Sequence, residues 1–359
     1  RSVGHTSMPW NDLYGTARAQ MPGLMYPPLV IRLKTRGIQR LLAPCNGVER
    51  QYFAANLASV FRHIWRLNRA CTNKRKKLVL HVHNPSLAWI VLLVRISMPS
   101  VIIVANLHNE WSCFNSFQRL SLHVMSMVLR KKICVSEAIS YTIPKYIQKY
   151  LRNKNALTYI QNGIRSGVLA DKHPIEQLPL QRRADVIVVA RMVPQKNLKL
   201  IIKVFSMLKN ADKLIWFGDG LQKKELEKII SSYDIKERVV LCGVQPRDKV
   251  FKALSESCAY LSCSLWEGIG VANLEAAAMG CRPFLSNIAP HNEIAERLNL
   301  DTFPLEDPVP WVEAIDRHLA NIAAVEGENS KQLASCTREK FDLDNTVRSY
   351  MSIYVNLTK

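Results

Sequence analysis

The chain of 359 residues is 48% aliphatic or aromatic, which is enough for two domains with full hydrophobic cores and excludes a disordered protein. Its longest apolar run, Leu87 to Val94, is too short to span a membrane, and its nine cysteines lack the CxxC pairs or regular spacing of a disulfide framework or zinc site. The formal charge is +20, and residues 1–170 carry all of the excess, with 24 basic and four acidic residues, so we expect an anionic partner for the first half.

Strands and helices alternate through the first half of the chain. Residues 1–21 are predicted to form a loop, and because the chain begins at Arg1 without a secretory signal, we expect a first strand to be missing. Predicted strands are Pro28–Leu33, Gly37–Ala43, Lys77–Val82, Val101–Ala105, Lys132–Val135 and Leu157–Ile160. Predicted helices are Glu49–Cys71, Leu87–Ile96, Leu120–Leu129 and Ser136–Leu151, the last with Ser136 as its N-cap. This alternation predicts a parallel sheet covered by helices.

A second alternating series begins near Ala184. Its predicted strands are Asp185–Val189, Lys213–Phe217, Val239–Cys242, Ala259–Ser262 and Arg282–Leu285, and its helices include Leu198–Leu208, Leu221–Ser231 and Arg247–Ser255. Residues 165–183, a polar stretch with two prolines, are predicted to link a first domain (1–164) to a second (184–340), and residues 341–359 to form a closing helix. Two Rossmann-like α/β domains are therefore expected, with ligand at the carboxyl ends of the strands.

The most informative stretch runs from Leu265 to Pro283, LWEGIGVANLEAAAMGCRP. A turn with Glu267 is followed by a helix that carries Glu275. The glycines of the turn let a ligand approach backbone N–H groups, and the positive end of the helix points to the same place, which favours phosphate. Glu275 can accept hydrogen bonds from a vicinal diol such as ribose, so the residues predict a bound nucleotide diphosphate. The expected backbone contacts are Gly268, Ile269, Gly270 and Val271.

This stretch resembles the E-x7-E signature of retaining glycosyltransferases with the GT-B fold, in the family 4-like group called glycosyl transferases group 1. The AAAMGCRPFLS that follows is similar to that family's run of small residues, glycine and proline. The resemblance is specific over residues 185–297 and diffuse over residues 78–164. It implies an α/β protein whose two parallel sheets face a cleft and whose C-terminal helix crosses back onto the first domain.

Three further motifs of the second half resemble the same family. Arg191 and Lys196, in RMVPQKN, match the G-R-x-x-x-x-K-G turn that holds the donor diphosphate, although alanine and asparagine replace its glycines. They would stabilise the charge that the departing diphosphate gains; two solvated charges are the alternative. Gly218-Asp219-Gly220 resembles the V-G-D-G turn of the nucleotide pocket, with a plain tight turn as an equal alternative. Gly243 resembles the glycine that borders the base.

The first half offers fewer matches. His108 resembles the family histidine that reaches the transferred sugar, whereas we predict structural roles for His81 and His83. Asn162 and Gly163 resemble the N-G-[IV] turn at the hinge between the domains. Gly4 is a candidate for the family's glycine loop, which faces the donor phosphates.

The resemblance implies transfer of a sugar from a nucleotide-diphospho-sugar to a hydroxyl of a glycan or lipid-linked acceptor, with retention of configuration. Glu267 and His108 would hold sugar hydroxyls. The chain has neither an Asp-x-Asp in a loop that follows a predicted strand nor a phosphate-binding P-loop, so we expect no metal and no cofactor besides the donor substrate. A GT-B epimerase or phosphorylase and a non-catalytic GT-B subunit remain alternatives.

The basic first half points to a membrane. Its charges are not interleaved with stacking aromatics as in nucleic-acid modules, so no nucleic acid is expected. The segment at 143–154 spaces apolar residues at helical intervals between lysines, which indicates either a core-facing helix or a membrane-facing one. We expect the second, in a cytoplasmic protein bound peripherally to anionic lipid. The basic clusters are Lys74–Lys77, Arg130–Lys132 and Lys145–Lys154, and the apolar positions are Ile143, Tyr146, Ile147, Tyr150 and Leu151.

Overall fold

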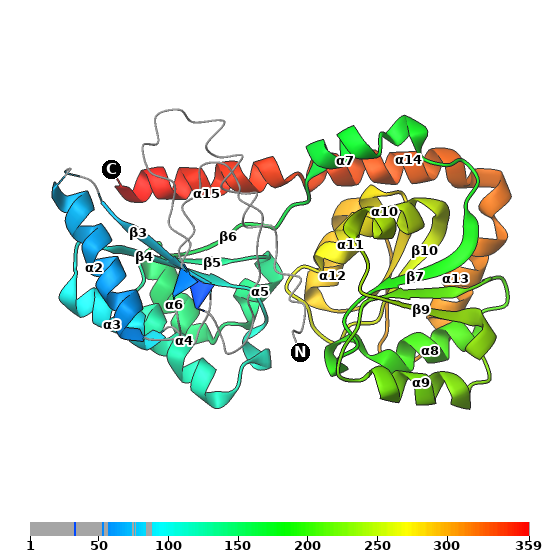
Figure 1. The fold of residues 1–359 in the computed structure, drawn as a ribbon, viewed down its shortest axis with the longest axis horizontal. Helices are drawn as coiled ribbons and strands as arrows, with labels where there is room; N and C mark the ends of the chain where they lie inside the picture. The colour runs from blue at the N-terminus through cyan, green and yellow to red at the C-terminus, as the bar shows by residue number, and fades with distance from the viewer. Residues whose placement is uncertain are drawn as a thin grey trace. The chain divides into compact units, whose positions relative to one another are not determined.

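The computed structural model of the chain describes residues 32–33, 52–53, 57–73, 75, 77–83 and 88–358 (Figure 1). The chain divides into two compact units: residues 1–161 with 344–359 form the first, and residues 162–343 form the second. Gly4, the strand predicted at Gly37–Ala43, most of that at Pro28–Leu33 and part of the basic cluster at Lys74–Lys77 lie outside the described residues.

The first unit contains a four-stranded parallel sheet whose strands follow chain order. These strands are β3 (Val79–Val82), β4 (Ile102–Leu107), β5 (Lys131–Cys134) and β6 (Leu157–Tyr159), and a separate pair joins β1 (Arg32–Leu33) to β2 (Tyr52–Phe53). The helices are α2 (Leu57–Asn73), α3 (Ala88–Ser97), α4 (Ser116–Val128), α5 (Glu137–Thr142) and α6 (Lys145–Asn153). Because every right-handed crossover steps in the same direction, α3, α4 and α6 cover one face of the sheet.

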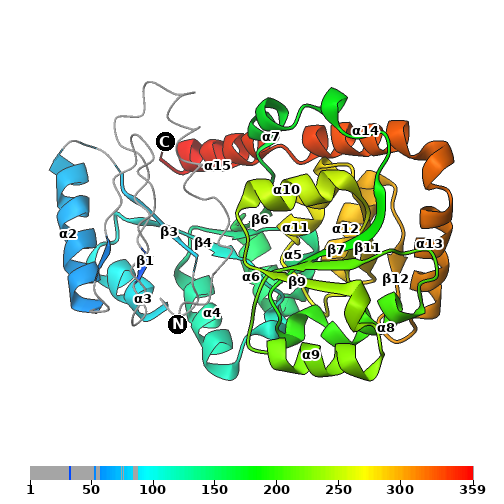
Figure 2. The same ribbon diagram turned by 45° about the vertical axis from the view of Figure 1, so that its right-hand side comes forward.

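The C-terminal helix α15 (Leu343–Thr358) covers the opposite face of this sheet (Figures 1 and 2). Two of its tyrosines bond to strand residues. Asn106 Nδ2 donates to Tyr350 Oη at 2.6 Å, and Tyr354 Oη lies 2.5 Å from His81 Nδ1. The predicted return of the C-terminal helix to the first unit is confirmed, and His81 has the structural role predicted for it.

Two helices of the first unit differ from the prediction. Pro144 divides the predicted helix at Ser136–Leu151 into α5 and α6, because a residue before proline avoids helical geometry, and Ile143 is extended (φ −66°, ψ 137°). Ser136 caps α5 as predicted: its Oγ accepts from Ile139 N–H at 3.2 Å. The helix predicted from Glu49 begins only at Leu57, since the aromatic pair in β2 favours a strand.

The apolar face of α6 is largely part of the core. Ile147 and Leu151, with the preceding Ile143, are buried in a cluster with residues of β5 and α5. The expectation that these three residues meet a membrane is therefore wrong. Tyr146 and Tyr150 of the same helix remain exposed.

Lys132 also departs from its predicted place on a basic surface. It is fully buried on β5, where its Nζ donates to Ser126 Oγ at 3.0 Å and lies 5.0 Å from the centre of the Trp111 ring. Burial lowers the pKa of the Lys132 ammonium to about 8, with Cys134 opposing the shift. This lysine stabilises the layer between β5 and α4 and adds nothing to the surface charge.

The second unit is a doubly wound parallel sheet of order β12-β11-β10-β7-β8-β9. Its strands are β7 (Arg183–Val189), β8 (Leu214–Phe217), β9 (Val239–Gly243), β10 (Ser257–Ser262), β11 (Arg282–Ser286) and β12 (Thr302–Phe303). One face packs against α8 (Leu198–Met207), α9 (Lys223–Ser232) and α13 (Val309–Ala320). The other packs against α10 (Arg247–Glu256), α11 (Val271–Ala278), α12 (Ala289–Leu298) and α14 (Ile322–Lys340).

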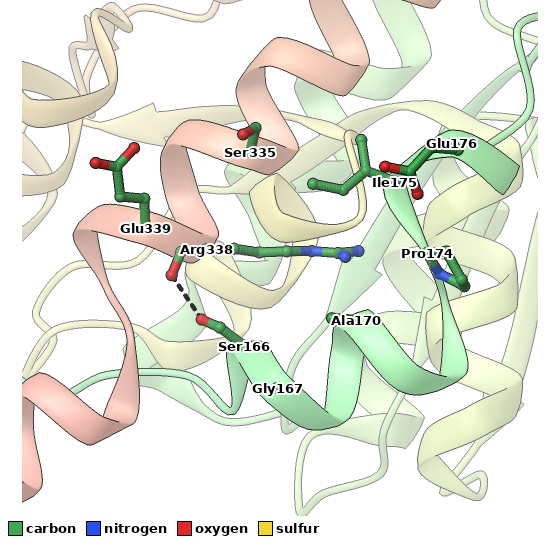
Figure 3. A pocket seen from close by; sticks show the side chains of 9 residues that line it. All are labelled: Ser166, Gly167, Ala170, Pro174, Ile175, Glu176, Ser335, Arg338 and Glu339. Atoms are coloured by element: carbon green, nitrogen blue, oxygen red, sulfur yellow. Dashed lines mark hydrogen bonds between the residues drawn. The ribbon is translucent and has the colours of Figure 1, made fainter.

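Residues 165–183, predicted as a linker, belong to the second unit and form α7 (Ser166–Lys172) and the short helix η3 (Ile175–Gln177). A hollow of about 410 Å³ lies between these helices and α14 (Figure 3). Arg338 extends across it and donates to the carbonyls of Ala278 at 3.0 Å and His173 at 2.9 Å, while Ser166 Oγ donates to the Arg338 carbonyl at 2.6 Å. Arg338 thus ties three helices together, and the hollow contains no predicted site residue.

Candidate functional site

The second unit brings two predicted loops together where its strand order reverses. β7 and β10 are parallel neighbours, but the chain leaves β7 towards β8 and leaves β10 towards β11 on the other side. Loops that diverge in this way open a crevice at the carboxyl edge of the sheet. The loop after β7 carries Arg191 and Lys196, and the loop after β10 carries Glu267. These three are among the side chains predicted to act on the donor.

Hydrogen bonds join the two loops directly. Leu265 N–H donates to the Gln195 carbonyl at 2.8 Å, and Gln195 Nε2 donates to the Trp266 carbonyl at 2.7 Å. Gln195 lies in the short helix η4 (Pro194–Lys196), so its bonds set the position of the next residue, Lys196. Gln195 was not predicted as a site residue, although it lies inside the motif that identified Arg191 and Lys196.

Glu267 is held by several donors. Lys196 forms an ion pair with its Oε1, Ser264 Oγ donates to the same oxygen at 2.8 Å, and Gln195 Nε2 lies 3.4 Å from Oε2. Burial alone would raise the pKa of the Glu267 carboxyl, but the charges of Lys196 and His291 and these hydrogen bonds outweigh it and leave the pKa below its usual value. Glu267 is therefore an ionised acceptor, the form that binds sugar hydroxyls.

Arg191 differs from Lys196 in its surroundings. Its guanidinium makes no hydrogen bond or ion pair with any side chain in the described ranges, whereas Lys196 is committed to Glu267. A free guanidinium fork beside an anion site matches the geometry of phosphate oxygens. Arg191 is therefore the cation of this loop that no side chain of the described residues neutralises.

The second glutamate lies on α11 and is paired as well. Arg247, on α10, forms an ion pair with Glu275. Burial raises the pKa of the Glu275 carboxyl, and the charge and hydrogen bond of Arg247 oppose that shift. A hollow of about 180 Å³ borders the pair and is lined also by Arg165 and Phe251. Arg247 was missed in the sequence, where nothing distinguishes it from other surface arginines.

The start of α11 has the features of a ligand-facing helix end. Gly270 is its N-cap and has a left-handed backbone (φ 73°), and a Cβ there would lie 2.4 Å from Asn273 Nδ2. That amide nitrogen is buried and has no hydrogen-bond partner among the described residues. A buried donor without an acceptor costs free energy, so it points to a ligand at the end of this helix. Asn273 was not singled out in the sequence.

The predicted turn after β8 packs against the loop of Arg191, and Gly243 at the end of β9 is hydrogen-bonded to that turn. Gly218 N–H donates to the Gly243 carbonyl at 2.8 Å, and a Cβ on Gly218 would lie 2.1 Å from the Ala190 carbonyl oxygen. The Asp219 carboxylate accepts from the N–H of Gly220 at 2.8 Å, so it stabilises its own turn. These residues shape the edge of the site by their backbone, and a direct contact of Asp219 with a donor stays a prediction.

A buried histidine is connected to Glu267 through two serines. His291, in the first turn of α12, has its Nδ1 3.0 Å from Ser286 Oγ, and Ser286 Oγ donates to the Ser264 carbonyl at 2.6 Å. Ser264 in turn bonds to Glu267, so the histidine and both serines form a chain of contacts that ends at the carboxylate. No motif in the sequence pointed to this histidine, because the contacts join the ends of two strands, β10 and β11, to the first turn of α12.

Three predicted residues, His108, Asn162 and Gly163, lie outside the loops described above and make contacts with other parts of the chain. His108 follows β4, and its Nε2 lies 3.0 Å from His83 Nδ1. Burial lowers the pKa of His108 to about 4, so its imidazole is neutral near pH 7. Asn162 is buried, and a Cβ on Gly163 would lie 2.6 Å from Leu343 N, so glycine is needed where residues 162–164 run beside 341–343. The hinge role of both residues stays a prediction.

Acidification is expected to destabilise the protein between pH 6.5 and about pH 4. Burial lowers the pKa values of His81, His108 and His291 to about 4 each, against 6.5 for an ordinary histidine. In this window the unfolded chain binds more protons than the folded one, so the unfolding free energy falls as pH falls, by up to about 1.4 kcal/mol per pH unit for each histidine. Urea unfolding at a series of pH values measures this slope of unfolding free energy against pH. The substitution His291→Asn should reduce the slope by the contribution of one histidine. A slope unchanged by that substitution contradicts the assignment.

Residues 171–323 match the family model of glycosyl transferases group 1. The phosphatidylinositol N-acetylglucosaminyltransferase GPI3 subunit of Saccharomyces cerevisiae is 25% identical over 152 residues, which cover 41% of this chain and 33% of that protein. The N-acetylgalactosamine-N,N'-diacetylbacillosaminyl-diphospho-undecaprenol 4-alpha-N-acetylgalactosaminyltransferase of Campylobacter jejuni is 30% identical over 96 residues, 27% of this chain and 26% of that protein. The chain thus spans a third or less of the length of these curated relatives.

Solved structures resemble the chain over most of its length. Anabaena HepE in complex with UDP has a TM-score of 0.70 at 14% identity, covering 86% of this chain and 87% of that chain. Staphylococcus aureus TarM has a TM-score of 0.66 at 17% identity, covering 84% and 59%. The lipopolysaccharide outer core galactosyltransferase WaaB has a TM-score of 0.63 at 16% identity, covering 87% and 85%. This likeness shows that the chain has the GT-B fold, as predicted.

Proposed function

We propose that this chain, whose residues 171–323 belong to the glycosyl transferases group 1 family, is a glycosyltransferase that takes its sugar from a nucleotide-diphospho-sugar. The observation that carries the proposal is the arrangement at the strand-order reversal of the second unit. There an unpartnered guanidinium, an ammonium–carboxylate pair and a glycine-capped helix with a buried unpaired donor meet at one sheet edge. Such a set suits a ligand with a dianionic centre and hydroxyl groups on either side.

The division of roles follows from the charges. Arg191 and Lys196 bind the diphosphate and stabilise the charge that it gains as the bond to the sugar breaks. Glu275 accepts hydrogen bonds from the ribose, and Glu267 and His108 bind hydroxyls of the transferred sugar. The acceptor hydroxyl forms its bond to the anomeric carbon on the face that the diphosphate leaves. The electrons of the broken bond pass to the diphosphate, one oxygen of which takes the acceptor's proton, so configuration is retained and no metal is needed.

We infer that the acceptor is a hydroxyl of a glycan or a lipid-linked saccharide. Two of the curated relatives are named for acceptors of a lipid kind, a phosphatidylinositol and a diphospho-undecaprenol. The basic first half fits the anionic headgroups around such an acceptor. In this proposal the protein works at the cytoplasmic face of a membrane, as a peripheral protein that binds no nucleic acid.

Thermal unfolding with a panel of nucleoside diphosphates and their sugars tests the proposal. A nucleotide present at 100 times its dissociation constant should raise the unfolding free energy by about 2.7 kcal/mol. One base should stabilise far more than the others, and Arg191→Ala should reduce the shift given by the nucleoside diphosphate without changing the melting temperature of the ligand-free protein. If no nucleotide or nucleotide sugar shifts the transition, the chain has no donor site of this kind.

Glu275→Ala is expected to weaken nucleoside diphosphate binding by roughly 1.5–3 kcal/mol, because ribose hydroxyls lose a charged acceptor. The sharper readout compares the ribose nucleotide with its 2′-deoxy and 3′-deoxy analogues by calorimetry. The natural protein should prefer the ribose form, and the variant should bind all three alike. Glu256→Ala, on the adjacent α10, is the matched control and should keep the preference. A Glu275→Ala protein that still discriminates would remove the ribose assignment.

A further inference from the structure

The helices on one face of the first unit have an apolar surface that its core does not use. α3 is apolar nearly all round: one side packs into the core, and the opposite side is exposed. A helix that is apolar on every side is normally buried, yet α3 has only ten residues and lies at the surface. Its exposed apolar residues recur at intervals of four and three, one stripe along the helix: Trp89, Leu93 and Ile96.

The neighbouring helices continue this stripe. α4 packs beside α3 and exposes Phe117, Leu120 and Met127 at helical spacing. α6 lies along α4, where Tyr150 Oη donates to the Met127 carbonyl at 3.4 Å and Tyr146 bonds to His123. We call these eight exposed residues the outer face; each is between 37 and 70% exposed. The outer face consists of Trp89, Leu93, Ile96, Phe117, Leu120, Met127, Tyr146 and Tyr150.

The charged residues on the helices of the outer face all have one sign. α2, α3, α4 and α6 contain no aspartate or glutamate. A layer of helices that faces only water normally carries both acidic and basic residues and exposes few large apolar side chains. Here exposed cations flank the apolar stripe instead, and aromatic side chains are among its members, as at the level of lipid headgroups. The flanking cations are Arg95, Arg119, Lys145, Lys149 and Arg152.

We propose that the outer face docks on an anionic lipid bilayer, with its apolar side chains inserted among the acyl chains and its cations at the headgroups. The inference rests on the proposed function only for its purpose, which is to bring the enzyme to a lipid-linked acceptor. Charge decides the occupant: two copies of this face would repel each other, whereas anionic lipid supplies both an opposite charge and an apolar interior. None of the helices in the described ranges could cross a membrane, so the docking is interfacial.

Insertion and simple electrostatic adsorption predict different results. In vesicle flotation, binding to anionic vesicles should exceed binding to neutral ones, and each positive charge should contribute roughly fivefold. The combined substitution of Lys145, Lys149, Arg152 and Lys154 by glutamate should therefore abolish binding. The triple variant Trp89→Ser, Leu93→Ser, Ile96→Ser should lower affinity by about tenfold or more for each fully inserted side chain. Surface adsorption alone would leave that variant unchanged and would overturn the insertion.

The control variant removes exposed apolar side chains from the second unit instead of the first. Leu221→Ser and Val244→Ser replace two exposed residues there and should leave vesicle binding intact. Light scattering of the natural protein should show the mass of a monomer with or without salt. A dimer that becomes monomeric in the triple variant would mean that the outer face binds a second copy of the chain instead of lipid. Nucleotide-induced thermal shifts, measured in the same samples, separate the two hypotheses. Shifts without vesicle binding overturn only the docking, and vesicle binding without shifts overturns only the proposed function.

Discussion

Replacing Arg191 with alanine is expected to lower turnover at saturating donor by about 100-fold or more. Its guanidinium has no partner among the described residues, so the substitution removes a ligand contact without breaking an internal one. A contact to charge that develops only in the transition state lowers kcat and kcat/KM together when it is lost. Steady-state kinetics with varied donor, at fixed excess acceptor, measures both constants. A rise in KM with unchanged kcat would mean that Arg191 only binds the donor.

Lys196→Ala needs a different design, because Lys196 is the ion-pair partner of Glu267. Its loss leaves a buried carboxylate without its cation, which destabilises the site in addition to any effect on charge development. The double variant Lys196→Ala, Glu267→Gln removes that unpaired charge. A double variant that recovers stability but turns over more slowly than the single variant Glu267→Gln would assign a catalytic role to Lys196, whereas turnover equal to that of Glu267→Gln would make the lysine structural.

Gly218→Ala is expected to cost at least about 3 kcal/mol of unfolding free energy and most of the activity. Gly218 has φ 133°, which side-chain-bearing residues avoid at a cost of about 1–3 kcal/mol, and its Cβ would lie 2.1 Å from the Ala190 carbonyl oxygen. That carbonyl also accepts from Trp216 Nε1 at 3.0 Å and immediately precedes Arg191. Relief of the collision must therefore move the loop that carries Arg191. Urea unfolding and donor kinetics measure the two effects.

Gly243 provides the control for this prediction. It ends the adjacent strand and also has a positive φ of 64°, but a Cβ there would meet no atom within 4 Å. Gly243→Ala should lower the unfolding free energy only by the cost of a left-handed backbone at alanine, about 1–2 kcal/mol. Equal losses in the two variants would show that backbone conformation, rather than the contact with Ala190, explains the requirement for glycine at position 218.

The fold of the second unit could be predicted because its signals are local. Continuous apolar strands, glycine turns and amphipathic helices succeed one another at the spacing of a parallel sheet, and the predicted strands at Asp185–Val189 and Lys213–Phe217 match β7 and β8 within two residues. The first unit gave weaker signals. There, apolar residues at helical spacing continue across Pro144 and predict one helix. The proline nevertheless separates α5 from α6.

The contacts within the site could not be predicted in the same way. The sequence indicated Lys196, Glu267 and Glu275 by type and spacing, but the pairing of Glu275 with Arg247 depends on how α10 packs against α11. In the sequence His291 and Asn273 are ordinary polar residues of helices; only in the folded chain are His291 Nε2 and Asn273 Nδ2 buried without hydrogen-bond partners among the described residues. Burial and distance between strand ends are properties of the folded chain, and no periodicity encodes them.

The two ion pairs of the site have a kinetic consequence. Glu267 and Glu275 each hold a cation of their own unit, Lys196 and Arg247 respectively. A hydroxyl or phosphate that takes one member of a pair competes with the other member, so the net affinity of a ligand is smaller than its contacts alone would give. In the proposed function the same competition would favour departure: as a spent nucleoside diphosphate loosened, the protein's own charges would re-form their bonds and speed its release. Where release limits the turnover of an enzyme, such internal competitors raise the rate.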